Sequence, residues 1–174
     1  MALTVEDGTG LAGAESYVSA SDADTYHSAR GNSAWIGSED EKEEALRKAA
    51  EYLDGRYRGR WKGVRGSKAQ ALAWPRARVV DEDGYSVSST TVPNAVVAAT
   101  CEAALLILSG TDLSPTLTRE NFATQEEVKV GPIEESRSYS SGAPTKPVVT
   151  RIEQKLSGLL TSGTGGGAIF LQRA

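Results

Sequence analysis

The chain has 174 residues, of which 39% are hydrophobic, and its formal net charge of −4 corresponds to a pI near 5.1. This length allows one domain with appended arms. The hydrophobic share is below the usual ~45–50%, which predicts a modest core joined by long connections. An acidic chain is not expected to coat nucleic acid generally, although net charge hides local patches. The single cysteine, Cys101, excludes an internal disulfide and fits a reducing compartment.

Targeting and membrane segments are not expected. The N-terminal sequence MALTVEDGTG has neither a basic start nor an apolar run, so it does not resemble a signal peptide. The longest uninterrupted apolar run, residues 103–108, is too short to span a bilayer. We expect a soluble protein made inside the cell.

Helical patterns begin after a glycine-rich, extended N-terminal segment in which Tyr17 and Val18 are the first expected buried anchors. Ser19 and Ser21 are placed to cap a short helix over residues 21–30. The sequence Ser-Glu-Asp-Glu at residues 38–41 is a capping-box pattern that predicts a longer helix through about residue 58. One stripe of that helix is expected to be buried, namely Ala45, Leu46, Ala49, Ala50, Leu53 and Tyr57.

The second half of the chain predicts two hairpins and two more helices. Asp83 and Gly84 predict a tight hairpin over residues 79–87. Pro93 begins a helix that is apolar almost all round and is expected at the centre of a bundle. A second hairpin is expected over residues 126–139 and an amphipathic helix over residues 147–160. Residues 161–174 then predict a flexible glycine-rich hinge and an apolar docking tail that carries Ile169, Phe170 and Leu171.

The residue types needed for catalysis or metal binding are sparse. With His27 and Cys101 alone in their classes, a structural zinc site is excluded. The acidic run at residues 81–84 lacks the remaining spacing of a calcium loop. Cys101 is expected to be a buried, inert thiol, and no nucleophile-elbow pattern surrounds a serine. The glycines at 163–167 follow a helix rather than a strand, so they do not predict a dinucleotide site. We expect no enzyme activity and no cofactor.

A basic stretch at residues 56–76, RYRGRWKGVRGSKAQALAWPR, is the most distinctive feature. It contains no carboxylate, and its seven basic residues are Arg56, Arg58, Arg60, Lys62, Arg65, Lys68 and Arg76. Interleaved with Tyr57, Trp61 and Trp74, they have the composition of a single-strand binder that neutralises phosphates and stacks bases. In the alternative interpretation the three aromatic side chains are packing anchors and the charges contact neighbouring subunits.

Residues 5–32, 45–87 and 92–108 resemble a family encoded among the head and neck genes of tailed phages. Its members are often labelled DnaT-like single-stranded-DNA-binding proteins, and the same family is similar to the head–tail connector, or neck adaptor, proteins. The most specific motif is ALAWPR at residues 71–76, followed by the Asp-x-Asp-Gly hairpin. The resemblance is strong over residues 5–110 and looser in the second hairpin and the following helix.

The connector resemblance implies a mainly α fold, namely one domain over residues 1–160 with about four helices, one or two hairpins and extended terminal arms. Glycine hinges and an apolar tail suit a subunit that grips its neighbours, so the connector is favoured over the single-strand binder. It implies a homo-oligomeric ring, expected to be a 12-mer, that joins the portal protein to a tail or stopper protein in the virion neck. The expected contacts include packaged double-stranded DNA in the channel but no membrane. A strongly basic channel would hinder DNA ejection, which favours interface contacts for most of these basic residues.

Overall fold

Four helices form the body of the protein. The computed structural model describes residues 2–114, 125–130, 133–138 and 149–161. Its helices are α1 (Ala20–Ser28), α2 (Glu39–Arg56), α3 (Asn94–Leu108) and α4 (Thr150–Leu156), and α4 continues into a short 3₁₀ helix, η2 (Ser157–Leu159). The mainly α fold class predicted from the sequence is therefore confirmed.

Side-chain caps fix the beginnings of the first two helices. The Ser19 hydroxyl accepts a hydrogen bond from the Asp22 amide at the start of α1. At the start of α2, the Glu41 amide donates to the Ser38 hydroxyl at 3.3 Å and the Ser38 amide donates to the Glu41 carboxylate at 2.8 Å. These reciprocal bonds satisfy two amides that have no partner inside the helix. The capping box predicted at residues 38–41 is confirmed.

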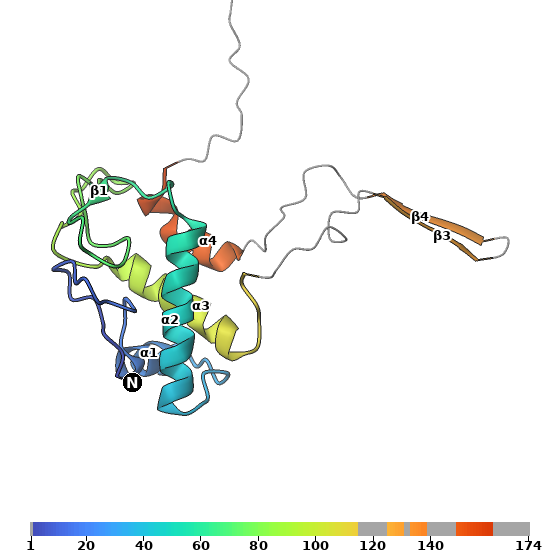
Figure 1. The fold of residues 1–174 in the computed structure, drawn as a ribbon, viewed down its shortest axis with the longest axis horizontal. Helices are drawn as coiled ribbons and strands as arrows, with labels where there is room; N and C mark the ends of the chain where they lie inside the picture. Colours follow the sequence, from blue (N-terminus) through green and yellow to red (C-terminus); the bar gives the residue numbers. More distant parts are fainter. Residues whose placement is uncertain (1, 115–124, 131–132, 139–148, 162–174) are drawn as a thin grey trace, which may run out of the picture.

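Helix α3 lies at the centre of the bundle and contacts α1, α2 and α4. In Figure 1, α2 crosses α3, α1 lies near the beginning of α2, and α4 lies near its end. One apolar stripe of α2, including Leu46 and Leu53, faces a fully buried face of α3 that includes Val96 and Ala103. The nearly all-apolar composition of α3 therefore reflects contacts with neighbouring helices on three sides.

The connection between α2 and α3 contains two short antiparallel pairings. Strands β1 (Val64–Arg65) and β2 (Arg76–Ala77) pair with Val64 opposite Ala77. A single bridge then joins Val80 and Ser86, and Gly84, with a φ of 89°, lies at the turn between them. This turn corresponds to the Asp-Gly hairpin signal in the sequence.

Residues 157–161 are fastened to the segment that follows α2. An antiparallel bridge joins Trp61 to Leu160, and the Lys62 amide donates to the Leu159 carbonyl at 3.0 Å. The Thr161 amide donates to the Arg60 carbonyl at 2.7 Å. The backbone of the last described segment is thus tied to the loop next to α2, and we call this contact the terminal clamp.

Strands β3 (Gln125–Val130) and β4 (Ile133–Ser138) form an antiparallel hairpin in which Val130 pairs with Ile133. This is the second hairpin expected from the sequence. Neither strand contacts any of the described helices or β1 and β2.

Two other expectations concern the ends of the chain. The N-terminal segment has no helix, but it lies against the body, where Ala14, Tyr17 and Val18 are buried. The predicted docking tail at residues 162–174, and with it Ile169, Phe170 and Leu171, lies outside the described residues. None of the helices in the described part of the chain is long and apolar enough to cross a membrane.

Candidate nucleic-acid interface

The three aromatic residues of the basic stretch lie in the core. Tyr57 and Trp74 are fully buried and Trp61 is 6% exposed. The ring centroids of Tyr57 and Trp61 are 5.6 Å apart, and those of Trp61 and Trp74 are 5.8 Å apart, both in edge-to-face geometry. Such pairs stabilise a core beyond the area they bury. In this arrangement the rings pack against each other and do not form an exposed platform for bases.

Arg56 and Arg60 form ion pairs within the chain. The guanidinium groups of both residues approach the same carboxylate oxygen of Glu153 on α4, at 3.7 Å and 3.6 Å. Arg56 is the last residue of α2 and Arg60 lies in the turn that follows it, and both side chains reach Glu153 from there. The two arginines therefore link the end of α2 to α4.

Arg76 binds three backbone carbonyls of its own loop. Its Nε donates to the Lys62 carbonyl at 2.7 Å, and its terminal nitrogens donate to the carbonyls of Gly63 at 2.8 Å and Ala73 at 3.2 Å. Burial lowers the pKa of Arg76, an effect that the nearby Tyr17 and Asp54 oppose. Arg76 holds the two sides of the loop together, next to the β1–β2 pairing.

Lys62 and Arg65 also bind backbone carbonyls. The Lys62 ammonium donates to the carbonyls of Val80 at 3.1 Å and Gly158 at 2.7 Å, which reinforces the terminal clamp. Arg65 donates to the Gln70 carbonyl. Every residue has a backbone carbonyl, so the amino-acid sequence does not show which carbonyl a basic side chain will bind. These contacts could therefore not be predicted from composition.

Arg58, Lys68 and Arg78 differ from the other basic residues of this region. All three are exposed and form no hydrogen bond or ion pair with any described residue. Arg78 has a φ of 59°, a left-handed conformation that is uncommon outside glycine. No residue in the described part of the chain neutralises these three cations.

A hollow of about 840 Å³ lies beside the end of α2 and brings four arginines together. We call it the arginine groove, and its charged lining residues are Arg47, Arg58, Arg65, Arg76, Glu15, Glu51 and Asp54. Trp61 also lines it, and its indole Nε1 is buried and has no hydrogen-bond partner among the residues that the structure describes. Arg47 already pairs with Glu15 at 3.3 Å and Glu43 at 3.1 Å. Arg58 is therefore the groove arginine most available to a ligand.

Asp54 anchors the ALAWPR segment to α2 from within this groove. Its carboxylate accepts hydrogen bonds from the Tyr17 hydroxyl at 2.5 Å and the Ala73 amide at 2.7 Å. Burial raises the pKa of Asp54, whereas these two hydrogen bonds and the charges of Arg65 and Arg76 act to lower it. Tyr17 was expected only as a buried anchor, and its hydroxyl is also a structural link between three segments.

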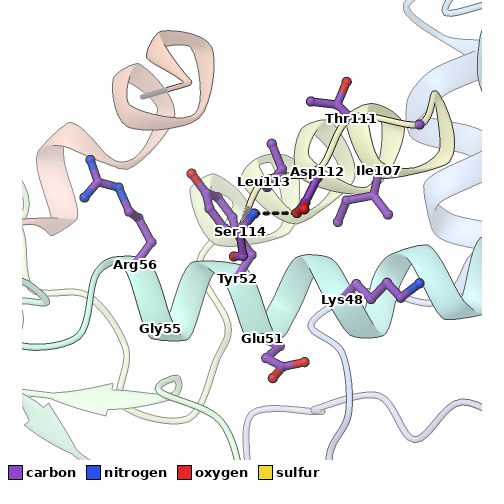
Figure 2. A pocket seen from close by; sticks show the side chains of 11 residues that line it. Lys48, Glu51, Tyr52, Gly55, Arg56, Ile107, Thr111, Asp112, Leu113 and Ser114 are labelled. Atoms are coloured by element: carbon purple, nitrogen blue, oxygen red, sulfur yellow. Dashed lines mark hydrogen bonds between the residues drawn. The ribbon is translucent and has the colours of Figure 1, made fainter. Parts of the chain in front are cut away.

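A second hollow, of about 610 Å³, lies on the opposite side of Gly55, between α2 and residues 107–114. In Figure 2, Tyr52 extends from α2 toward that segment, Arg56 rises from the same side of α2 at the left of the pocket, and Glu51 points away. Tyr52 is 7% exposed, yet its hydroxyl has no hydrogen-bond partner in the described structure, and neither does Arg56 Nε. The sequence analysis did not identify Tyr52, because the residues opposite it come from a distant segment.

The candidates for catalysis or metal binding occupy structural positions. Burial raises the pKa of Cys101 to about 12, so its thiol is protonated at neutral pH. His27 is 1% exposed, and its Nδ1 lies 3.0 Å from the side-chain amide of Asn32. Within the described ranges, no group of three or more His, Cys, Asp or Glu side chains is arranged to hold a metal ion.

A family model matches the whole chain, residues 1–174, and its description is "Putative DnaT-like ssDNA binding protein". Comparison with curated proteins and comparison with solved structures each gave no match. The match agrees with the single-strand-binding label in the resemblance drawn from the sequence. Nothing in these comparisons supports the neck-adaptor assignment that the sequence analysis favoured. The chain belongs to the DnaT-like single-stranded-DNA-binding family.

Proposed function

We propose that this protein binds single-stranded DNA through the arginine groove. The observation that carries this proposal is that four arginines line one hollow, and that one of them, Arg58, is exposed and forms no hydrogen bond or ion pair with a described residue. The family match supports the same activity. This reverses the order of preference in the sequence analysis, where the single-strand binder was the alternative.

Binding in the groove is expected to depend mainly on phosphates. Guanidinium groups match phosphate geometry through pairs of parallel hydrogen bonds. The buried rings of Tyr57 and Trp74 do not offer stacking surfaces there. Since phosphate contacts position a strand without reading its sequence, we expect weak sequence preference in this part of the site.

The affinity is expected to be modest and salt-sensitive. Four arginines contribute +4 and three carboxylates contribute −3, so the lining residues of the groove carry a formal charge of only +1. Burial also raises the pKa of Asp54, which weakens the opposing charge. For a single strand, log K is expected to fall with log salt by about 0.7 for each phosphate neutralised.

Fluorescence anisotropy with labelled oligo(dT) over a series of salt concentrations tests the proposal. We expect Arg58→Gln to weaken binding and to reduce the salt slope by about 0.7, because one phosphate contact is lost. Arg30→Gln removes the same charge from an exposed residue that lines neither hollow, so it should leave the slope unchanged. Failure of the wild-type protein to bind oligo(dT) at low salt would refute the proposal.

A second candidate function remains the subunit of a phage neck ring. The observation that favours it is the β3–β4 hairpin, which contacts none of the described helices. A lone two-stranded hairpin is marginally stable in water, so a neighbouring copy or another neck protein would be a natural support. The proposed partners remain a twelve-membered ring of this chain, the portal protein and a tail or stopper protein.

Analytical ultracentrifugation distinguishes this second candidate. A closed ring predicts a species of defined high mass that is independent of DNA, whereas a monomer at all accessible concentrations argues against it. In an infection assay, deletion of residues 163–174 should prevent head–tail joining if the tail docks on a neck partner.

A further inference from the structure

We propose that a single strand bound in the arginine groove crosses α2 at Gly55 and places one base in the second hollow, which we call the Tyr52 pocket. This inference rests on the proposed function and specifies the path of the strand. It makes Tyr52 and Arg56 base-contacting residues, although neither lines the arginine groove.

The two hollows are continuous along the surface of α2. Glu51 and Gly55 line both of them. With 3.6 residues per turn, Arg47 and Asp54 lie to one side of this pair on the helix surface, facing the groove. Tyr52 and two further residues of α2, Lys48 and Arg56, lie to the other side, facing the pocket.

Gly55 leaves the passage between the hollows open. A Cβ atom built at this position would meet no other atom within 4 Å. Any larger side chain there would project over the surface that separates the two hollows. Glycine is unfavourable inside a helix, and at position 55 the missing side chain leaves room for a strand to cross α2.

The Tyr52 pocket contains buried groups that can donate hydrogen bonds. The Tyr52 hydroxyl and Arg56 Nε are buried, and neither makes a hydrogen bond of good geometry with a described residue, although the Arg56 side chain lies close enough to Tyr52 to lower its pKa. Leaving such donors unsatisfied is unfavourable, and a ligand with acceptor atoms would satisfy them. Burial raises the pKa of Tyr52, although the charge of Arg56 opposes this, so the hydroxyl is protonated at neutral pH and able to donate.

A nucleobase fits these features. Base edges present oxygen and nitrogen acceptors, such as O6 and N7 of guanine, and base faces stack on aromatic or apolar side chains. Ile107 and the buried Leu113 provide apolar walls, and the Asp112 carboxylate holds their segment by accepting from the Ser114 amide at 2.8 Å. The volume of about 610 Å³ lies within the ~300–1,000 Å³ typical of ligand pockets.

Two substitutions test the path in anisotropy titrations. Gly55→Leu should obstruct the crossing and weaken binding of a 16-nucleotide oligo(dT) at least about fivefold, the equivalent of one lost base contact. An oligonucleotide of about 4 nucleotides fits in the groove alone and should be little affected. Gly55→Ala is the matched control, because its Cβ meets nothing and projects little.

Tyr52→Phe provides a second test that keeps the ring. It should weaken binding of the 16-nucleotide strand about 2- to 10-fold through loss of one hydrogen bond. The melting temperature should change little, because among the described residues the hydroxyl makes no hydrogen bond of good geometry and only Arg56 lies close to it. Glu51→Gln should instead strengthen binding of the long strand, since it removes a negative charge at the crossing.

The outcomes separate this inference from the proposed function. Suppose that the wild-type protein binds DNA and that Arg58→Gln weakens this binding, but that Gly55→Leu and Tyr52→Phe both bind the long strand normally. The proposed crossing is then wrong, whereas binding in the arginine groove is supported. If the wild-type protein does not bind DNA at all, the proposed function and the crossing both fail.

Discussion

Replacing Tyr17 by phenylalanine should destabilise the protein, although it removes a single oxygen atom. The Tyr17 hydroxyl donates to Asp54 at 2.5 Å and accepts from the amides of Ala73 at 3.0 Å and Trp74 at 3.3 Å. The side chain is 3% exposed, so water cannot readily replace these bonds. The phenylalanine ring fills the same space, which isolates the effect of the hydroxyl.

The magnitude follows from which groups lose their partners. A hydrogen bond to a charged group contributes about 1.5–3 kcal/mol, and an unsatisfied buried amide costs about 1–3 kcal/mol. Ala73 keeps its bond to the second oxygen of Asp54, so only the Asp54 bond and the Trp74 amide are affected. We expect a loss of about 3 kcal/mol, which at 2–4 °C per kcal/mol lowers the melting temperature by about 6–12 °C.

Thermal unfolding followed by circular dichroism measures this change. Tyr85→Phe is the control, because Tyr85 is 72% exposed and its hydroxyl forms no bond with a described residue. That control should remain within about 0.5 kcal/mol of wild type. A melting temperature of Tyr17→Phe within about 2 °C of wild type would refute the reasoning that Asp54 and Tyr17 anchor the ALAWPR segment.

Two further predictions concern pH and backbone strain. Burial lowers the pKa of His27, the only histidine of the chain. The folded state therefore binds fewer protons than the unfolded state near this pKa. Stability should fall as the pH is lowered below about 6.5. Urea unfolding at several pH values should show this dependence of stability on pH in the wild type and a weaker one in His27→Gln. The raised pKa of Asp54 acts in the opposite direction, but it is common to both proteins. Arg78→Gly should raise stability by up to about 1 kcal/mol, because glycine adopts the φ of 59° without strain while losing more chain entropy on folding. If Arg78 also contacts DNA, the same variant should bind oligo(dT) less tightly, and a less stable variant would contradict the strain argument.

The helices were predictable from the sequence because their signals are local. The capping box at Ser38 and the apolar stripe of α2 each lie within one element, and both were predicted correctly. The apolar composition of α3 likewise predicted its central position. Such signals depend on neighbours three or four residues apart, which a sequence displays directly.

The site was less predictable because its contacts join distant segments. The acceptors of Lys62 include a carbonyl of η2, and the carboxylate that meets Arg56 and Arg60 comes from α4. The sequence showed a cluster of charge but not which charges the fold would use internally. The left-handed conformation of Arg78 is also invisible in the sequence, since arginine rarely adopts it.

The terminal clamp has a consequence for the order in which the protein folds. It joins Thr161 to Arg60 across 101 positions, so this contact forms only after all of the residues between them have been synthesised. Contacts between residues far apart in the sequence slow folding, because the intervening loop must close before they form. We therefore expect a nascent chain that lacks α4 to hold α2 and α3 with the Trp61 side of the core uncovered, and to depend on chaperones until synthesis reaches the clamp.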